Sequence, residues 1–201
     1  GIVYGNTLTA LAAFVFASHG VLDVGMLIVL LVGLALVIGG AGALNNVIDK
    51  DIDACMARTR ERALPAGIIA PRHAVVFGVV LELIGLGILY RLASPLVCGV
   101  TAVGVVFYLG LYTPAKRKTT HSTLIGAVAG AVPPVAGYAA GAGTLDVLAL
   151  LLFLILVFWQ MVHFFAIGLY RVDDYRSARL PILPVHAEPR TVIHNMVVYA
   201  V

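Results

Sequence analysis

The chain has 201 residues, of which 61% are hydrophobic and only 11% are charged. Soluble globular domains are about 45–50% apolar and about 25% charged, so this composition excludes an ordinary soluble domain and indicates an integral membrane protein. The formal net charge of +3 comes from basic residues gathered in a few loops, which argues against a nucleic-acid-binding surface.

Uncharged stretches long enough to cross a bilayer recur along the chain. They cover residues 1–22, 24–44, 92–115, 119–145 and 147–170, and residues 73–90 also qualify with Glu82 as their one acid. A membrane-spanning helix needs about 20 mostly apolar residues. The sequence therefore predicts an all-α membrane bundle with six full spans, and residues 191–201 predict the start of a seventh. Glu82 is expected to form a hydrogen bond between helices.

The Lys and Arg residues indicate how the bundle is oriented. Twelve of the thirteen fall in loops 45–72, 114–120 and 171–190, and Arg91 alone lies on the other side. Because basic loops stay on the cytoplasmic side, we expect these three loops to face the cytoplasm from the cell inner membrane, or the matrix from the mitochondrial inner membrane. The chain starts without Met and stops within a span, so residues 1–201 are interpreted as a single transmembrane domain truncated at both ends.

The first polar motif directly follows the second span, in NNVIDKDIDACMARTRER, 45–62. If the helix continues, Asn45, Asp49 and Asp53 recur every four residues and share one face, which Asn46 joins from the side. Asp51 then points roughly the other way. The spacing predicts a stripe of two carboxylates and two amides at the inner end of this span.

Two carboxylates one helical turn apart repel each other unless a cation joins them. Oxygen ligands suit Mg²⁺, which usually takes one or two carboxylates together with waters and substrate phosphates. Arg58 and Arg62 follow directly, and their planar guanidinium groups match phosphate oxygens. The motif predicts a metal–diphosphate site. The alternative is an ordinary loop whose acids pair with its own arginines, and Lys50, Asp51, Arg60 and Glu61 are assigned to that alternative.

The loop YTPAKRKT, 112–119, adds a second group of cations. Tyr112 and Lys116 are four residues apart, although Pro114 disturbs a simple helical face. Lys116 would add positive charge to the same rim. Arg117 and Lys118 are explained at least as well by a role in setting membrane topology.

The second polar motif lies at the exit of the last full span, in FWQMVHFFAIGLYRVDDYRSARLPILPV, 158–185. In a continuous helix His163, Tyr170 and Asp174 would form a nearly straight line, with Asp173 beside it. A histidine inside an apolar span marks a function by default, and Arg176 adds a cation past the acids. The alternatives are a hydrogen-bonded core histidine and a helix-end ion pair of the two aspartates with Arg171 or Arg176.

These motifs resemble those of one protein family. The pattern Asn45-Asn46-x-x-Asp49-x-x-x-Asp53 resembles the first aspartate-rich motif of the UbiA superfamily of intramembrane prenyltransferases, and Tyr112-x-x-x-Lys116 resembles its Y-x-x-x-K element. The stretches DIDACMARTRERALPAG, YTPAKRKT and HFFAIGLYRVDDYRSARLPILPV are similar to the branch that farnesylates haem. Asn46 stands where many members have aspartate, and Tyr170 stands where the second motif has its first acid. Nine helices are expected in this family, so roughly the last two and a half are absent here.

The resemblance implies a Mg²⁺-dependent enzyme that transfers a farnesyl group from farnesyl diphosphate to a vinyl group of protohaem IX (haem b), with water addition giving haem O. The implied metal ligands are Asn45, Asn46, Asp49, Asp53, Asp173 and Asp174. The implied diphosphate-binding residues are Arg58, Arg62, Tyr112, Lys116 and Arg176. The residues implied as catalytic are Asp49, Asp53, Asp174 and Lys116, and the candidate haem contacts are His163 and Tyr170.

Other functions are compatible with the same sequence. A UbiA-type enzyme could use another acceptor, such as a phenolic acid, a chlorin or a glycerol phosphate, and a fragment without its last helices could be inactive. A cation-coupled transporter is the alternative from another class, but transporters hold their ionisable groups near the bilayer midplane. Besides the lipid bilayer, the candidate partners are haem A synthase and a second copy of the chain; no nucleic acid is expected.

Overall fold

The computed structural model describes residues 1–200 as a bundle of helices, without a strand in that range. The elements are α1 (Ile2–Ala17), α2 (Val24–Ile48), α3 (Lys50–Cys55), α4 (Pro71–Ile88), η1 (Leu89–Ala93), α5 (Pro95–Val105), η2 (Val106–Tyr112), α6 (Thr113–Ala115), α7 (Ser122–Ala142), α8 (Val147–Tyr170), α9 (Val172–Ser177), α10 (Leu183–His186) and α11 (Pro189–Ala200). Five helices in this range are long and apolar enough to cross a membrane: Val24–Ile48, Pro71–Ala93, Pro95–Ala115, Ser122–Ala142 and Val147–Tyr170. The predicted all-α membrane bundle is confirmed.

The first predicted span is shorter than expected. Helix α1 has 16 residues, and the chain turns directly after it, where His19 (φ 45°) and Gly20 (φ 86°) adopt left-handed backbone conformations. A positive φ is uncommon outside glycine and ends a helix. Within residues 1–200, the prediction of six full spans is therefore right for five, with α1 as a shorter apolar helix and α11 as the start of a further one.

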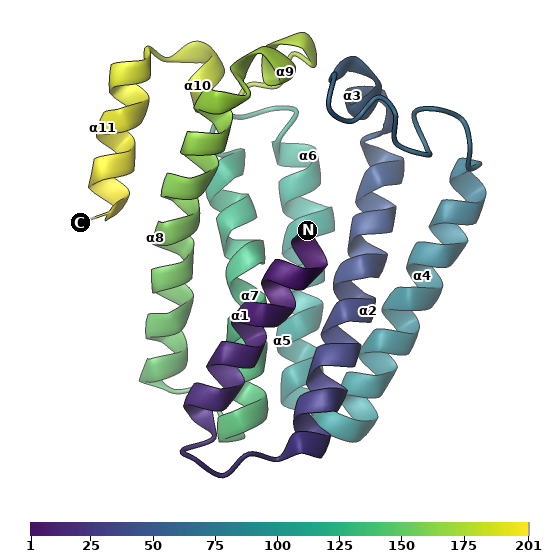
Figure 1. The fold of residues 1–201 in the computed structure, drawn as a ribbon, viewed down its shortest axis with the longest axis vertical. Coiled ribbons are helices and arrows are strands. Elements are labelled where there is room, and N and C mark those ends of the chain that lie inside the picture. Colours follow the sequence, from purple (N-terminus) through teal and green to yellow (C-terminus); the bar gives the residue numbers. More distant parts are fainter. Residues whose placement is uncertain (201) are drawn as a thin grey trace.

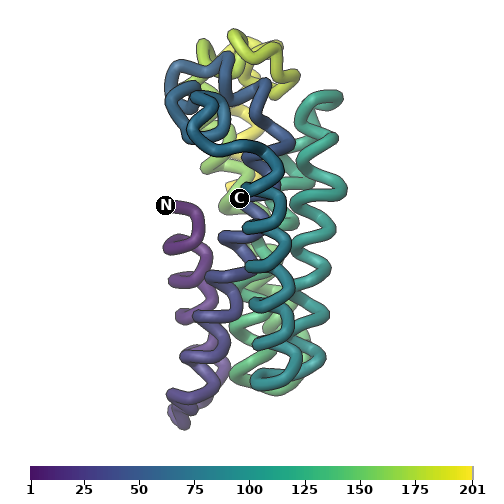
Figure 2. Tube along the Cα trace, turned by 90° about the vertical axis from the view of Figure 1, so that its right-hand side faces the viewer, coloured from purple at the N-terminus to yellow at the C-terminus, as the bar shows by residue number. Residues whose placement is uncertain are grey.

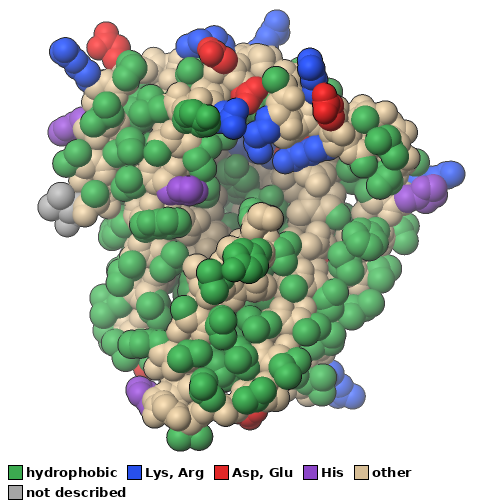
Figure 3. All heavy atoms as spheres, in the orientation of Figure 1, with side chains coloured by type: hydrophobic (Ala, Val, Ile, Leu, Met, Phe, Trp, Pro, Cys, Tyr) green, Lys and Arg blue, Asp and Glu red, His purple; other side chains and the backbone are tan. Residues whose placement is uncertain are grey.

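The long helices run alternately up and down, so the loops gather at two ends (Figure 1). The segments around α3, α6, α9 and α10 all lie at one end, and a view turned by 90° shows the same arrangement (Figure 2). Lys, Arg, Asp and Glu side chains crowd this end, while hydrophobic side chains cover the flanks below it (Figure 3). We call it the charged end; the three basic loops of the sequence meet there.

Glycines allow the helices to pack closely. An added Cβ at Gly137 of α7 would collide with the Ala10 backbone of α1, and one at Gly40 of α2 would lie 2.7 Å from the carbonyl oxygen of Gly78 in α4. Membrane helices associate largely through such close van der Waals contact. The first crossing holds α1 against α7, and the second holds α2, whose C-terminal end carries the first polar motif, against α4.

Glu82 lies at the crossing of α2 and α4, where the prediction of a hydrogen bond between helices is wrong. The side chain is buried against Gly40, and neither carboxylate oxygen has a hydrogen-bond partner among the described residues. The facing surface of α2 is glycine backbone, whose amide and carbonyl groups are used within the helix. The close packing of α2 and α4 therefore leaves the Glu82 carboxyl group without a hydrogen bond from the described residues.

The packing of α1 on α7 generates a first prediction. The substitution Gly137→Ala should destabilise the protein by about 1–3 kcal/mol, because the Ala10 backbone must move to admit the methyl group. The matched control is Gly87→Ala in α4, where an added Cβ meets nothing within 4 Å. Thermal unfolding in detergent should show a lower Tm for the first variant only, and equal Tm values would contradict this account of the packing.

Candidate active site

The first motif begins in the last turn of α2 and continues into α3. The helix breaks at Asp49, whose backbone (φ −95°, ψ 9°) is non-helical, and α3 starts at the next residue. Asn45, Asp49 and Asp53 are nevertheless buried on one side, at 9%, 5% and 5% exposure, whereas Asp51 is exposed. The predicted one-sided stripe is confirmed, with a break at Asp49 that the sequence did not predict.

The ends of the stripe are held by hydrogen bonds to other segments. Asn45 Nδ2 donates to the Thr113 hydroxyl (3.0 Å), which in turn donates to the carbonyl oxygen of Tyr108 (2.8 Å). This second bond reaches back from Thr113, directly after η2, into that π-helical segment, and π-helical turns often occur at functional sites. The amide end of the motif is therefore tied to the segment that carries Tyr112 and Lys116.

The second carboxylate of the stripe, Asp53, is paired within its own loop. Arg62 donates to Asp53 Oδ2 (2.8 Å) and to Asn46 Oδ1 (3.3 Å), and the Thr59 hydroxyl donates to the Asp53 carbonyl (2.9 Å). These bonds fold the loop after α3 back over the motif. The guanidinium of Arg62 consequently lies at the same rim as both carboxylates.

Lys116 forms a buried ion pair with Asp49 across the charged end. Burial, together with the nearby Arg117 cation, lowers the pKa of Lys116 to about 8, so the ammonium form still predominates at neutral pH. The ammonium also lies 5.4 Å from the centre of the Tyr112 ring, within cation–π range. The other carboxylate oxygen, Asp49 Oδ1, is buried and accepts no hydrogen bond from the described residues.

Arg117 contacts the outer side of the same junction. Its guanidinium donates to both carboxylate oxygens of Asp51 (2.7 Å each) and to the carbonyl of Ile48 (2.7 Å), and it lies 3.6 Å from Asp49 Oδ1. The hydrogen bonds from Arg117 hold the pKa of Asp51 down at about 2. The sequence assigned Arg117 to membrane topology and Asp51 to an ordinary loop. The structure shows in addition that the two side chains bind each other beside Asp49.

The second motif meets the first at the charged end. The Ser177 hydroxyl donates to the carbonyl of Cys55 (2.9 Å), and Leu180 packs in one apolar cluster with Ile52 and Met56 of the first loop. Tyr175 packs against this cluster. Burial raises the pKa of Tyr175, and the nearby Asp174 carboxylate raises it further, whereas the Arg58 cation lowers it. The Tyr175 phenol therefore lies near charged residues of both motifs.

The predicted straight line through the second motif is wrong beyond Tyr170. Helix α8 ends there, and Arg171 (φ −116°, ψ 25°) redirects the chain before α9. Tyr170 is 79% exposed and stacks on the Arg171 guanidinium at 4.7 Å instead of lining the cavity described below. Asp173 forms the helix-end ion pair with Arg176 (2.9 Å), as the alternative interpretation held.

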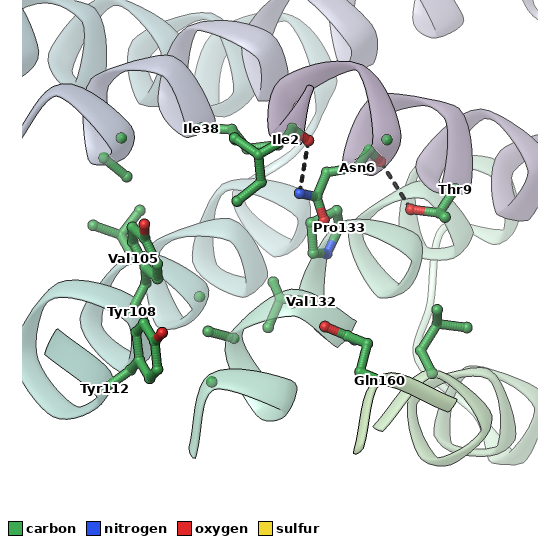
Figure 4. Close-up of a pocket in the computed structure, with 18 of the residues that line it drawn as sticks. Ile2, Asn6, Thr9, Ile38, Val105, Tyr108, Tyr112, Val132, Pro133 and Gln160 are labelled. Carbon is green, nitrogen blue, oxygen red and sulfur yellow. Dashed lines mark hydrogen bonds between the residues drawn. The ribbon is translucent and has the colours of Figure 1, made fainter. Parts of the chain in front are cut away.

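Directly below the charged end lies a cavity of about 590 Å³ between α1, α2, α5, η2, α7 and α8. Asn45 and Lys116 line its polar end, and most of the remaining lining is apolar. Figure 4 shows Tyr108 and Tyr112 on one side of the cavity and Asn6 and Gln160 across from them. The volume lies in the range typical of small-molecule sites, about 300–1,000 Å³.

Two aromatic residues of α8, Trp159 and His163, also line the cavity. His163 stacks on Trp159 with ring centres 5.0 Å apart and an interplanar angle of 9°. Both side chains are exposed, so they stand at the cavity mouth rather than in a closed core. The surface is hollowed between the charged end and the rest of the bundle, on the face shown in Figure 3. The core-histidine alternative for His163 is therefore wrong.

The implied metal ligands Asp49, Asp53, Asp173 and Asp174 do not gather into a single cluster in the described residues. No group of three or more His, Cys, Asp or Glu side chains in residues 1–200 is placed to hold a metal ion, and Asp49, Asp53 and Asp173 are each paired with a nearby cation. The first stripe still fits Mg²⁺, which needs only one or two carboxylates beside waters and phosphate oxygens. The unpartnered Asp49 Oδ1 is the observation that carries this fit.

Sequence reasoning missed several residues of the site. Tyr108 could have been found, since it precedes Tyr112 and Lys116 at the same spacing of four. Thr113, Tyr175 and Gln160 carry no comparable signal. Their positions depend on contacts between segments far apart in the chain, such as the bond from Gln160 to the Ala127 carbonyl (3.3 Å).

Comparison with known proteins gives consistent results. The model of the UbiA prenyltransferase family matches residues 6–201. A protoheme IX farnesyltransferase of Pseudomonas syringae is 41% identical over 92% of this chain and 63% of its own length, and one of Sodalis glossinidius is 39% identical over the whole chain and 68% of its own length. The chain thus spans about two thirds of these relatives.

A solved structure has a similar fold. It is that of a UbiA homologue from Archaeoglobus fulgidus bound to DMAPP and Mg²⁺, which matches 96% of this chain and 69% of its own with a TM-score of 0.79 and 13% identity. At this identity the likeness concerns the arrangement of the helices.

The buried pair of Lys116 and Asp49 generates a second prediction. Lys116→Met should destabilise the protein by about 3 kcal/mol, because it leaves a buried carboxylate without its cation. Adding Asp49→Asn should recover most of this loss, since the uncompensated charge is then gone. Unfolding in detergent measures both variants, and a double variant as unstable as the sum of its single changes would contradict the pairing.

Proposed function

The chain belongs to the UbiA prenyltransferase family, and on this premise we propose that it transfers a farnesyl group from farnesyl diphosphate to a vinyl group of protohaem IX. One observation carries the proposal: two acid-and-arginine loops, far apart in sequence, meet above the mouth of an apolar cavity. The relatives named protoheme IX farnesyltransferase support haem as the acceptor.

The first motif would hold the metal with the diphosphate. We assign its ligands to Asn45, Asn46, Asp49 and Asp53 of the first motif, with Asp173 and Asp174 as the candidates from the second loop. Bound there, Mg²⁺ would stabilise the negative charge of the departing diphosphate. The Lys116 ammonium, already at the polar end of the cavity, would exchange part of its contact with Asp49 for a phosphate oxygen.

The cations of the rim neutralise the leaving group as the carbon–oxygen bond breaks. Arg58 and Arg62 come from the first loop, Lys116 from the segment after η2, and Arg176 from the second loop. Cations fixed in advance where negative charge develops supply a large part of catalysis, because they do not have to reorganise. Tyr112 contributes by holding Lys116 over its ring.

The cavity accommodates the apolar parts of the reaction. The farnesyl chain would lie among the side chains below the rim, where the apolar walls exclude water from a reactive allylic cation. The porphyrin would approach from the wall formed by Trp159 and His163, which stand at the mouth. We assign His163 to positioning the acceptor; the exposed and outward-lying Tyr170 is a weaker candidate.

This function defines where the protein acts. Residues 1–201 would form part of a single prenyltransferase domain of the cell inner membrane, or of the mitochondrial inner membrane, with the charged end facing the cytoplasm or matrix. Both substrates partition into membranes, so the enzyme receives them at the level of its cavity. Haem A synthase and a second copy of the chain are the partners to seek by crosslinking in membranes.

The acceptor is tested by incubating membranes that contain the protein with labelled farnesyl diphosphate, Mg²⁺ and, in separate reactions, haem b, a phenolic acid and a chlorin. We expect label on haem alone, as the hydroxyethylfarnesyl product identified by mass. Label only on the phenol would replace the acceptor while keeping the enzyme class. Movement of a solute across the membrane without any prenylated product would favour the transporter.

The metal-binding role predicts the effect of two neutral substitutions. Asp49→Asn and Asp53→Asn should each lower kcat by about 100-fold or more and raise the Mg²⁺ concentration needed for half-maximal activity, because each removes one anionic ligand. The control is Glu61→Gln, an exposed acid of the same loop that should retain full activity. Chelation should abolish turnover in the unsubstituted protein, and activity that survives both chelation and Asp49→Asn would rule out this mechanism.

A further inference from the structure

We propose that Arg117 is a positioning residue, anchored on Asp51 and on the end of α2, that orients the Asp49 carboxylate toward the diphosphate site. The inference rests on the proposed function, because it takes that site as the destination of Asp49. It concerns two residues that the sequence assigned to topology and to an ordinary loop.

The contacts of Arg117 converge on one short junction. Its guanidinium donates to Asp51 Oδ1 and Oδ2 and to the carbonyl of Ile48, all at 2.7 Å. Ile48 is the last residue of α2, and Asp51 lies in the first turn of α3. One planar group therefore holds the two sides of the break at Asp49 in a fixed relation, as its five fork-like donors allow.

Electrostatics explains why this junction needs such a clamp. The C-terminus of a helix carries a partial negative charge, and carboxylates near it are unfavourable. Here Asp49, Asp51 and Asp53 follow the end of the 25-residue helix α2 within five positions. Lys116 and Arg62 pair with the first and the last of these acids, and Arg117 neutralises the middle one and the helix end. Without Arg117, the Asp51 carboxylate and the end of α2 would repel each other, which would favour a different backbone conformation at Asp49.

Arg117 acts from behind the site rather than within it. Asp51 is exposed and, like Arg117, lines a separate surface pocket of about 250 Å³, whereas Lys116, the partner of Asp49, lines the main cavity. The guanidinium is 3.6 Å from Asp49 Oδ1, too far for a hydrogen bond but close enough to attract it. Asp49 therefore keeps one oxygen on Lys116, while its other oxygen accepts no hydrogen bond and lies beside the Arg117 guanidinium.

The decisive variant is Asp51→Asn. If Asp51 acted only through its charge, removing a carboxylate near the site would strengthen the binding of an anion. If Asp51 anchors Arg117, the loss of the charged two-point contact should weaken binding instead. With one Mg²⁺ per pyrophosphate the complex still carries a net negative charge, so the two interpretations predict changes of affinity in opposite directions.

The experiment measures the binding of inorganic pyrophosphate with one equivalent of Mg²⁺ by calorimetry, with the whole protein in detergent. We expect the affinity to fall by about 10-fold or more in Arg117→Met and in Asp51→Asn, the range seen when the support of a metal ligand is removed. Combining the two substitutions should add little, because they break the same contact. Arg117→Lys should bind more weakly than the unsubstituted protein, since an ammonium cannot span the three acceptors.

Matched controls separate positioning from general effects of charge and folding. Arg60→Met and Glu61→Gln make the same charge changes at exposed positions of the neighbouring loop and should leave the affinity unchanged. Asp51→Glu keeps the charge, lengthens the side chain and should still weaken binding, which gives a second variant if Asp51→Asn does not fold. Thermal unfolding in the same detergent establishes that each variant is folded.

Three outcomes decide the matter. Weaker binding in Asp51→Asn and Asp51→Glu, with intact controls, supports the positioning role. Equal or tighter binding in either Asp51 variant overturns it, even if Arg117→Met binds poorly. Failure of the unsubstituted protein to bind Mg²⁺–pyrophosphate would instead refute the proposed diphosphate site, and with it the function from which the inference starts.

Discussion

The architecture of the charged end depends on one buried ion pair, between Lys116 and Asp49. The aspartate stands where α2 ends, and the lysine stands where the chain leaves α6. Two charges can be buried at the edge of an apolar bundle only when they compensate each other. Their pairing therefore ties α2 to the segment after α6, places the Lys116 ammonium at the polar end of the cavity and leaves one carboxylate oxygen of Asp49 without a hydrogen bond.

The fold was predictable because the membrane simplifies the physics. Long apolar stretches must become helices, since a bilayer offers no other partner for backbone amides and carbonyls. Charge distribution then fixes which loops share a side. The same reasoning failed at α1, where a left-handed turn at His19 and Gly20 ends the helix early, and at Glu82, where glycine packing leaves an acid without a partner.

The site was predictable only as far as its residues repeat along a helix. The spacing of Asn45, Asp49 and Asp53 gave the buried stripe, although the break at Asp49 was not visible. Helical spacing also misplaced Tyr170, because the chain turns at Arg171. Contacts between distant loops, such as that of Arg117 with Asp51, leave no repeating pattern in the sequence, because they depend on how whole helices pack. Residues of this kind can be identified only from the three-dimensional structure.

The uneven polarity of the cavity has a consequence for the orientation of any molecule bound in it. Asn45 and Lys116 lie at the end nearest the charged end, and most of the remaining lining is apolar. An amphipathic molecule would therefore bind with its polar head toward the loops and its chain within the bundle, because the reverse orientation would bury the head among apolar side chains. The orientation of the bundle in the bilayer thus also sets the direction in which such a ligand points.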